Sequence, residues 1–213
     1  MRERPPPAVS ESTVRAASNP VTGLILAGGQ GRRMGGVDKG LKLLRGKPMV
    51  QWVIERLAPQ VDELLINANQ NIDAYGRFGH PVIPDEIPGY AGPLAGLHRG
   101  LSAAHNELVA TSPCDSPFLP RDLVTRLRDA LTSENAELAV AKTGDQVHPV
   151  FCLCRRSVLP GLTAFLESGG RKIDAWYSAL RVVEVAFDDQ APTFSNINTA
   201  DELQKYDSGA LPD

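Results

Sequence analysis

Short apolar runs alternate with longer amphipathic stretches along most of the chain. Glycine, proline or polar clusters follow the short runs, which is typical of buried strands. The first run, 22–27, leads directly into a group of glycines. The runs that predict strands are 22–27, 63–67, 81–84, 108–111, 138–141, 150–153 and 181–185.

The longer stretches carry apolar residues at the three- and four-residue spacing of helices. In 93–104, for example, Leu94, Leu97 and Leu101 recur on one face. The predicted helices are 48–57, 93–104, 121–131, 157–166, 171–179 and 199–206, the last capped by Asn198 or Thr199. Strands alternating with helices predict a three-layer α/β fold with a mostly parallel central sheet. In such sheets ligands bind beyond the carboxyl ends of the strands, so the following loops are expected to carry the chemistry.

The 213 residues fit one domain with additional terminal segments. We expect a disordered N-terminal extension over 1–20, because its Pro-, Arg- and Ser-rich sequence has no apolar face to bury. A single domain is expected over 21–206 and a flexible tail over 207–213. The net charge of −3 gives no indication of nucleic-acid binding. No run approaches the ~20 apolar residues that cross a bilayer, and the N-terminus lacks the apolar segment of a secretory signal.

The cysteine content indicates a reducing compartment. Cys114, Cys152 and Cys154 cannot form a full set of disulfides, which fits a cytoplasmic protein. Cys152 and Cys154 share one face of a predicted strand. A Cys-x-Cys pair can bind zinc, but no nearby Cys or His pair completes four ligands, so core packing is the favoured interpretation.

A glycine-rich loop follows the first strand. Five glycines lie within 28–36, interleaved with two arginines that include Arg33 and followed by Lys39. Glycine lets backbone N–H groups approach an anion closely, and Arg and Lys side chains add positive charge. The loop is not a Walker A motif, because the only Gly-Lys pair precedes Pro48, nor a dinucleotide fingerprint, because Met34 replaces the third glycine. It predicts a triphosphate site; the alternative is a flexible surface turn.

One acidic residue, Asp115, follows the predicted strand 108–111 and stands between Pro113 and Pro117. The carboxyl ends of parallel strands lie at one edge of a sheet, so Asp115 is expected near the glycine loop. One carboxylate with waters and substrate phosphates is the usual way in which proteins hold Mg²⁺. Asp115 is therefore a predicted magnesium ligand; the alternative is a turn or a cap for the next helix.

The segment LAGGQGRRMGGVDKGL at 26–41 resembles the signature of the molybdenum cofactor guanylyltransferases, and the resemblance covers 21–206. Further blocks follow in that family's order: Gly46-Lys47-Pro48, Ile66-Asn67-Ala68-Asn69, Val82-Ile83-Pro84-Asp85, Gly92-Pro93-Leu94-Ala95-Gly96, Pro113-Cys114-Asp115 and Asn196-Ile197-Asn198-Thr199. The first block is the most specific; the Gly-Lys-Pro and Gly-Pro-Leu-Ala-Gly blocks are shared with sister transferases. The resemblance implies a Rossmann-like nucleotidyltransferase fold, GTP and Mg²⁺ as co-substrates, and guanylated molybdopterin and pyrophosphate as products.

When the family's motifs are matched to this sequence, the resemblance also implies which residues contact the nucleotide. These are Leu26, Ala27, Gly28, Gly29, Lys39, Asn67, Asp85 and Asp115. Within this set, Lys39 contacts the phosphates and Asp115 also binds Mg²⁺. Asn198 stands where related transferases often place a second acidic metal ligand, so metal binding and helix capping are alternatives for it.

The expected nucleophile is the terminal phosphate of molybdopterin. A phosphate monoester has its second pKa near ~6, so it is largely dianionic at neutral pH and needs no general base. The attacking phosphate and the triphosphate are both anions and repel each other. Mg²⁺ and the basic loop reduce this repulsion by neutralising charge on the α-phosphoryl oxygens and the departing pyrophosphate. Arg33, Lys39 and Asp115 are therefore the predicted catalytic residues.

The second half of the chain is expected to bind molybdopterin. His148, Arg171, Asn196 and Asn198 are the candidate contacts. The alternatives are a structural turn for His148, which precedes a proline, and a solvated helix end for Arg171.

The glycine-rich loop at 28–36 is also compatible with two other kinds of function. A molybdopterin cytidylyltransferase, or another small-molecule nucleotidyltransferase, would use the same phosphate chemistry; the cytidylyl relatives tend to read Leu-Ala-Ala-Gly where this chain has Leu26-Ala27-Gly28-Gly29. A non-catalytic nucleotide sensor or carrier would keep the loop without needing Asp115. The resemblance favours the guanylyltransferase, with GTP and molybdopterin cofactor as ligands and no nucleic-acid or membrane partner. It also implies transient contact with cofactor-insertion or molybdoenzyme-maturation proteins.

Overall fold

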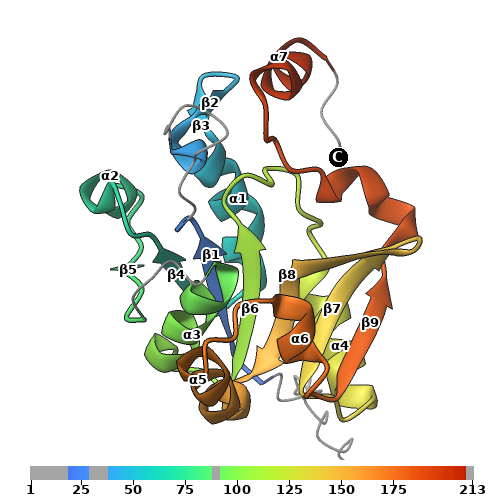
Figure 1. Cartoon of the computed structure of the whole chain (residues 1–213). Helices are drawn as coiled ribbons and strands as arrows, with labels where there is room; N and C mark the ends of the chain where they lie inside the picture. The colour runs from blue at the N-terminus through green and yellow to red at the C-terminus, as the bar shows by residue number, and fades with distance from the viewer. Residues whose placement is uncertain (1–18, 29–37, 88–91, 210–213) are drawn as a thin grey trace, which may run out of the picture.

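A seven-stranded sheet forms the centre of the computed structural model, which describes residues 19–28, 38–87 and 92–209. The strands lie in the order β5-β4-β1-β6-β8-β7-β9 (Figure 1). Their bounds are Val21–Leu26 for β1, Glu63–Asn67 for β4, Val82–Ile83 for β5, Leu108–Pro113 for β6, Leu138–Thr143 for β7, Gln146–Arg155 for β8 and Val182–Ala186 for β9. Each of the seven predicted strands is confirmed, although β8 is longer and β5 shorter than predicted.

Most neighbouring strands are parallel. β5, β4, β1 and β6 run in one direction, and β7 is parallel to β9. β8 is antiparallel to both of its neighbours. Only two residues connect β7 to β8, and so short a connection can join only antiparallel strands. The predicted mostly parallel α/β sheet is therefore confirmed, with β8 reversed.

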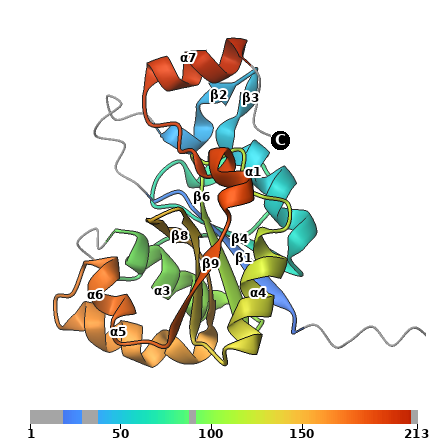
Figure 2. The same ribbon diagram turned by 90° about the vertical axis from the view of Figure 1, so that its right-hand side faces the viewer.

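Helices cover both faces of the sheet (Figure 1 and Figure 2). α1 and α4 pack on one face, and α3, α5 and α6 pack on the other. Their bounds are Met49–Leu57 for α1, Pro93–Ala103 for α3, Leu123–Ser133 for α4, Leu159–Glu167 for α5 and Ile173–Tyr177 for α6. Successive strand residues point to opposite faces, so Ile25 joins the core beneath α1 and α4 whereas Leu24 joins the core beneath α3 and α5. The result is the three-layer arrangement that the sequence predicts.

A third apolar cluster lies beyond the carboxyl ends of the parallel strands. The short antiparallel strands β2 (Leu43–Leu44) and β3 (Lys47–Pro48) lie beside the C-terminal helix α7 (Ala200–Ser208) (Figure 2). The backbone N–H of Arg45 donates to Asp207 Oδ1 at 2.5 Å and connects this hairpin to α7. The buried residues of the cluster are Leu44, Met49, Phe118 and Ile197. The hydrophobic pattern did not predict the hairpin, because each of its strands has only two residues.

Short helical turns complete the described connections. They are η2 (Lys39–Leu41), η3 (Ala58–Gln60), α2 (Ile72–Gly76), η4 (Arg156–Val158) and η5 (Asp188–Phe194). None of the helices in the described ranges is long and apolar enough to span a bilayer. Cys114, Cys152 and Cys154 are free and buried, and Cys152 and Cys154 lie in the core beneath α3 and α5. The interpretation of these two cysteines as core residues is confirmed.

Candidate active site

The carboxyl ends of β1, β4 and β6 meet at one edge of the sheet. In the parallel registers, Leu26 lies opposite Asn67 on β4 and Pro113 on β6. Beyond Leu26, the Ala27 N–H donates to the Asn67 carbonyl at 2.8 Å, and the Cys114 N–H donates to the Leu26 carbonyl at 3.1 Å. The segments that follow these three strands therefore leave the sheet side by side.

Three polar side chains from distant parts of the chain meet at this edge. Lys39 begins η2, Asp115 follows β6, and Asn198 precedes α7. The Lys39 Nζ lies 3.1 Å from Asp115 Oδ2 and 2.6 Å from Asn198 Oδ1. The Lys39 and Asp115 side chains are 22% and 13% exposed. Solvent reaches both groups, but partial burial makes their attraction stronger than that of a fully exposed pair.

Two contacts hold the segment before α7 against the loop after β6. The Ile197 N–H donates to the Asp115 carbonyl at 2.9 Å. The fully buried Ser116 donates its hydroxyl hydrogen to Asn196 Oδ1. The Asn196 amide oxygen is thus engaged in docking its own segment.

Thr199, rather than Asn198, caps α7. The Thr199 hydroxyl accepts from the Glu202 N–H at 3.2 Å, and the Glu202 carboxylate accepts from the Thr199 N–H at 3.0 Å. This reciprocal pair is a capping box. The side chain of Asn198 takes no part in it, and its amide oxygen accepts from Lys39 instead.

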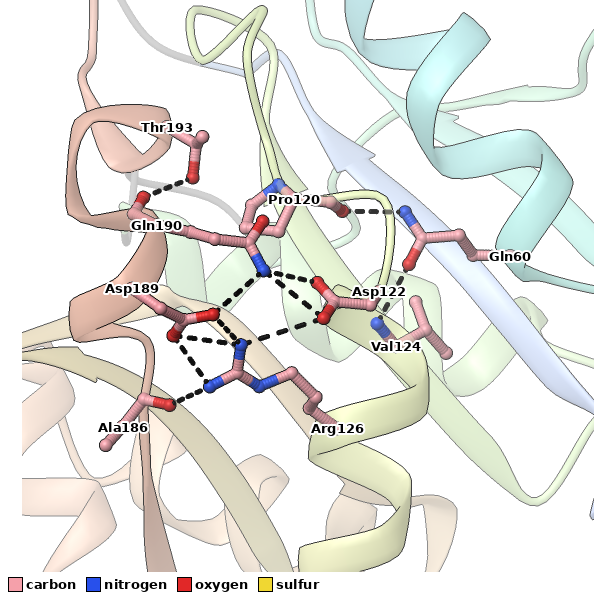
Figure 3. Close-up of polar contacts among 9 residues, drawn as sticks. All are labelled: Gln60, Pro120, Asp122, Val124, Arg126, Ala186, Asp189, Gln190 and Thr193. Atoms are coloured by element: carbon pink, nitrogen blue, oxygen red, sulfur yellow. Dashed lines mark hydrogen bonds and ion pairs between the residues drawn. The ribbon is translucent and has the colours of Figure 1, made fainter. Parts of the chain in front are cut away.

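The chain that leads to Asn198 is anchored on α4 (Figure 3). Arg126 donates to Asp189 Oδ2 at 2.9 Å, and Gln190 donates to Asp122 Oδ1 at 3.0 Å. The hydrogen bonds from Arg126 hold the pKa of Asp189 below its usual range, so this pair is ionised at neutral pH. η5 is therefore attached to α4 before the chain crosses to the strand ends.

A second polar cluster lies where β4 and β5 end. The Asn67 amide donates to Asp85 Oδ1 at 2.8 Å and to the Ile83 carbonyl at 3.0 Å. The Asn69 amide donates to Asp85 Oδ2 at 2.8 Å, and the Asp85 N–H donates back to Asn69 Oδ1 at 2.8 Å. The predicted nucleotide contacts Asn67 and Asp85 are thus brought together. Asn69 is not among the predicted site residues, although residues two apart in an extended chain project to the same side.

Two glycines make room for this second cluster. A Cβ at Gly28 would lie 3.0 Å from Asn69 Nδ2 and 3.2 Å from Asn67 Oδ1. A Cβ at Gly96, in the first half of α3, would overlap Asn67 Oδ1 and the Leu26 side chain. The glycines therefore let β1 and α3 approach the Asn67 amide directly.

The candidate residues from the second half of the chain have other contacts. The ring of His148 stacks on Phe194 at 4.7 Å between centroids and lies 2.7 Å from Thr143 Oγ1; burial lowers the pKa of His148. Arg171 donates to the Leu166 carbonyl at 2.9 Å, at the end of α5. In Figure 1 and Figure 2, α5 and α7 lie at opposite ends of the molecule.

Two of the predicted residues, Gly29 and Arg33, lie outside the described residues. Within the described ranges there is no cluster of three or more His, Cys, Asp and Glu side chains that could hold a metal ion. Burial raises the pKa of the Cys114 thiol, which therefore stays protonated and is a poor nucleophile. The arrangement thus offers one carboxylate, one amide oxygen and one cation, and suits the binding of a polyanion with its counter-ion.

The chain is similar in sequence to known proteins. Residues 23–182 match the family described as the MobA-like NTP transferase domain. The molybdenum cofactor guanylyltransferase of Cupriavidus pinatubonensis is 52% identical over 198 residues, which are 91% of this chain and 99% of the relative. The Bordetella petrii protein of the same name is 52% identical over 189 residues, which are 87% of this chain and 96% of the relative.

A solved structure has the same fold. The crystal structure of molybdopterin-guanine dinucleotide biosynthesis protein A from Archaeoglobus fulgidus superposes with a TM-score of 0.74 at 26% identity, over 87% of this chain and 96% of that one. The family match spans β1 to the start of β9 and so includes Lys39, Asp85 and Asp115. The chain therefore belongs to the MobA-like NTP transferase family and, within it, to the molybdenum cofactor guanylyltransferases.

Proposed function

We propose that this protein transfers GMP from GTP to the molybdenum-molybdopterin cofactor. The reaction forms the guanine dinucleotide form of the cofactor and releases pyrophosphate. The main support for the proposal is that Lys39 contacts both Asp115 and Asn198 beyond the ends of the strands. The relatives named molybdenum cofactor guanylyltransferase support the choice of donor and acceptor.

Two parts of the site would hold the two parts of GTP. Lys39, together with the predicted Arg33, would neutralise the phosphates, since a cation at a strand end is well placed to contact a polyphosphate. Asn67 and Asp85 would line the nucleoside side of the pocket. The Asn67 amide orients the Asp85 carboxylate, and the absence of side chains at Gly28 and Gly96 leaves room for the Asn67 side chain itself.

The residues at the phosphate side fit Mg²⁺. Mg²⁺ is commonly bound through one or two carboxylates plus substrate phosphates and waters, and Asp115 supplies one accessible carboxylate. The Asn198 amide oxygen and the Asp115 carboxylate contact the same Lys39 nitrogen, so they could face one ion. When bound there, Mg²⁺ supplies positive charge to the α-phosphoryl oxygens and the leaving group.

The chemistry follows from this placement. An oxygen of the terminal phosphate of molybdopterin forms a new bond to the α-phosphorus of GTP, and the bond between that phosphorus and the bridging oxygen breaks. The electron pair leaves with pyrophosphate. The attacking phosphate is already largely dianionic, so no side chain has to remove a proton. Lys39 acts by neutralising phosphate charge, and Asp115 by orienting the nucleotide for in-line attack.

The acceptor is proposed to bind on the side of the C-terminal segment. Asn198 faces the phosphate side of the site, and Asn196 lies two residues before it. His148 and Arg171 stay predictions for the same acceptor site. Arg171 Nη1 donates to the Leu166 carbonyl at 2.9 Å and to the Gly170 carbonyl at 2.6 Å.

The proposal also includes the cellular location of the protein and its protein partners. A cytoplasmic location is supported by the three free thiols, since a reducing compartment keeps cysteines unpaired. The product has to pass to a protein that uses it, so we propose transient contact with cofactor-insertion or molybdoenzyme-maturation proteins. No nucleic-acid or membrane partner forms part of the proposal.

The test is incubation of the full chain with GTP labelled at the α-phosphate, Mg²⁺ and molybdenum-molybdopterin. The expected result is label in a guanylated pterin, with one pyrophosphate released for each GMP transferred. A parallel reaction with labelled CTP measures donor choice. Preferred transfer from CTP would overturn the donor, and tight GTP binding without any transfer would favour a nucleotide carrier.

A further inference from the structure

The carboxylate of Asp38, directly before Lys39, accepts three hydrogen bonds. Asp38 Oδ1 accepts from the Tyr75 hydroxyl at 2.5 Å and from the Gly40 N–H at 3.2 Å. Asp38 Oδ2 accepts from the Asn71 amide at 3.1 Å. The Gly40 bond makes Asp38 the N-cap of η2, the turn that begins with Lys39. Asp38 therefore joins the phosphate-site turn to α2, a separate part of the chain.

The support for Asp38 is rigid. Tyr75 is fully buried in the core beneath α1 and α4. Burial raises the pKa of Tyr75, so its hydroxyl stays protonated and can always donate. A Tyr75 oxygen fixed in this way gives the Asp38 carboxylate one defined position.

Close packing fixes the other side of the turn. A Cβ at Gly40 would lie 2.5 Å from the Tyr75 hydroxyl oxygen and 3.1 Å from the Cys114 sulfur. η2 thus rests directly on Tyr75 and on the residue before Asp115. The backbone of Lys39 is held between two buried contacts, while its side chain reaches Asp115 and Asn198.

We propose that Asp38, supported by Tyr75, is a positioning residue that aims Lys39 at the phosphates of the nucleotide. This inference rests on the proposed function, since it needs Lys39 to bind GTP. A lysine side chain loses considerable rotational freedom when it is fixed. A turn that already fixes the start of that side chain reduces the freedom still to be lost on binding. The Asp38 carboxylate acts through Lys39 and does not itself contact the substrate.

The test is a double-mutant cycle on GTP affinity with the full chain and Mg²⁺, using a fluorescent GTP analogue. Asp38→Ala is expected to weaken binding about tenfold when Lys39 is present, and less than about twofold in the Lys39→Ala background. Equal losses in both backgrounds would overturn the inference, because they would show that Asp38 does not act through Lys39. Thermal melting of each variant shows whether it is folded.

Tyr75→Phe gives a second measurement, with Tyr177→Phe as its matched control. Tyr177 is also buried, and its hydroxyl donates at 2.6 Å to the Pro149 carbonyl. Both variants lose one buried hydrogen bond, so similar losses of stability are expected from both. Tyr75→Phe alone is expected to weaken GTP binding severalfold; equal effects on affinity would overturn the inference. Failure of the proposed function has a different outcome, in which the unaltered chain itself binds no GTP.

Discussion

Lys39 Nζ lies 2.6 Å from Asn198 Oδ1, although 159 positions separate the two residues along the chain. The contact closes the phosphate side of the site, because Asn198 arrives on the segment that docks on the loop after β6. Ile197 and Asn196 hold that segment through Asp115 and Ser116, so the position of Asn198 depends on the loop that carries the acidic residue.

Asn198→Ala is expected to lower GMP transfer about tenfold, because a hydrogen bond to a charged group is worth about 1.5–3 kcal/mol. The measurement is kcat/KM for GTP at saturating acceptor. Thr199→Ala is the control: it removes the cap of α7 and is expected to cost about 1 kcal/mol of stability while transfer changes little. If both variants lost activity in proportion to their loss of stability, Asn198 would have only a structural role.

Asp115→Asn is expected to lower kcat by about 10²–10³-fold, the range measured when one electrostatic stabiliser is removed from an active site. The substitution keeps the size of the side chain and removes its charge. Activity is compared over a Mg²⁺ titration. Asp129→Asn is the control, since Asp129 is an exposed carboxylate on α4. Near-normal turnover in the Asp115 variant would remove the proposed metal role.

Gly96→Ala is expected to weaken GTP binding and to destabilise the fold. The added Cβ would overlap Asn67 Oδ1, and overpacking of this kind costs about 1–3 kcal/mol. Gly161→Ala serves as the control, because a Cβ at that position in α5 meets nothing within 4 Å. It should raise stability by about 0.5–1 kcal/mol through better helix propensity. Unchanged GTP affinity in Gly96→Ala would exclude Asn67 from the nucleotide pocket.

Stability is expected to fall as the pH drops through the titration of His148. Burial lowers the pKa of His148 in the folded state, so below its ordinary value of about 6.5 the unfolded chain binds the proton more readily. The contribution of His148 is therefore fully present above pH ~6.5 and is lost as the pH falls through and below that value. Urea unfolding between pH 8 and 5 should show a shallower decline in His148→Gln than in the unaltered chain. An identical pH dependence for the two chains would contradict this.

The strands that build the site could be predicted from their apolar runs. Because parallel strands end at one edge, the sequence already predicts that Lys39 and Asp115 lie near each other, and the structure joins them at 3.1 Å. The apolar run of β8 does not by itself indicate the direction of the strand. The reversal of β8 follows instead from its short connection to β7.

The remaining parts of the site depend on tertiary contacts. The capping box of Thr199 and Glu202 follows a recognisable sequence spacing, but the contact of Asn198 with Lys39 cannot be read from the local pattern. The contact of Tyr75 with Asp38 is likewise invisible in the sequence, because α2 has only five residues and shows no clear periodicity. Such pairings arise from packing in space rather than from spacing along the chain.

The binding of the metal by Asp115 and of the nucleotide phosphates by Lys39 is tested most directly by a crystal structure of the full chain with the α,β-methylene analogue of GTP and Mn²⁺ in place of Mg²⁺. We predict an anomalous manganese signal beside the Asp115 carboxylate, with Lys39 Nζ in contact with the phosphates. A nucleotide bound away from Lys39, or manganese bound without Asp115, would contradict this prediction.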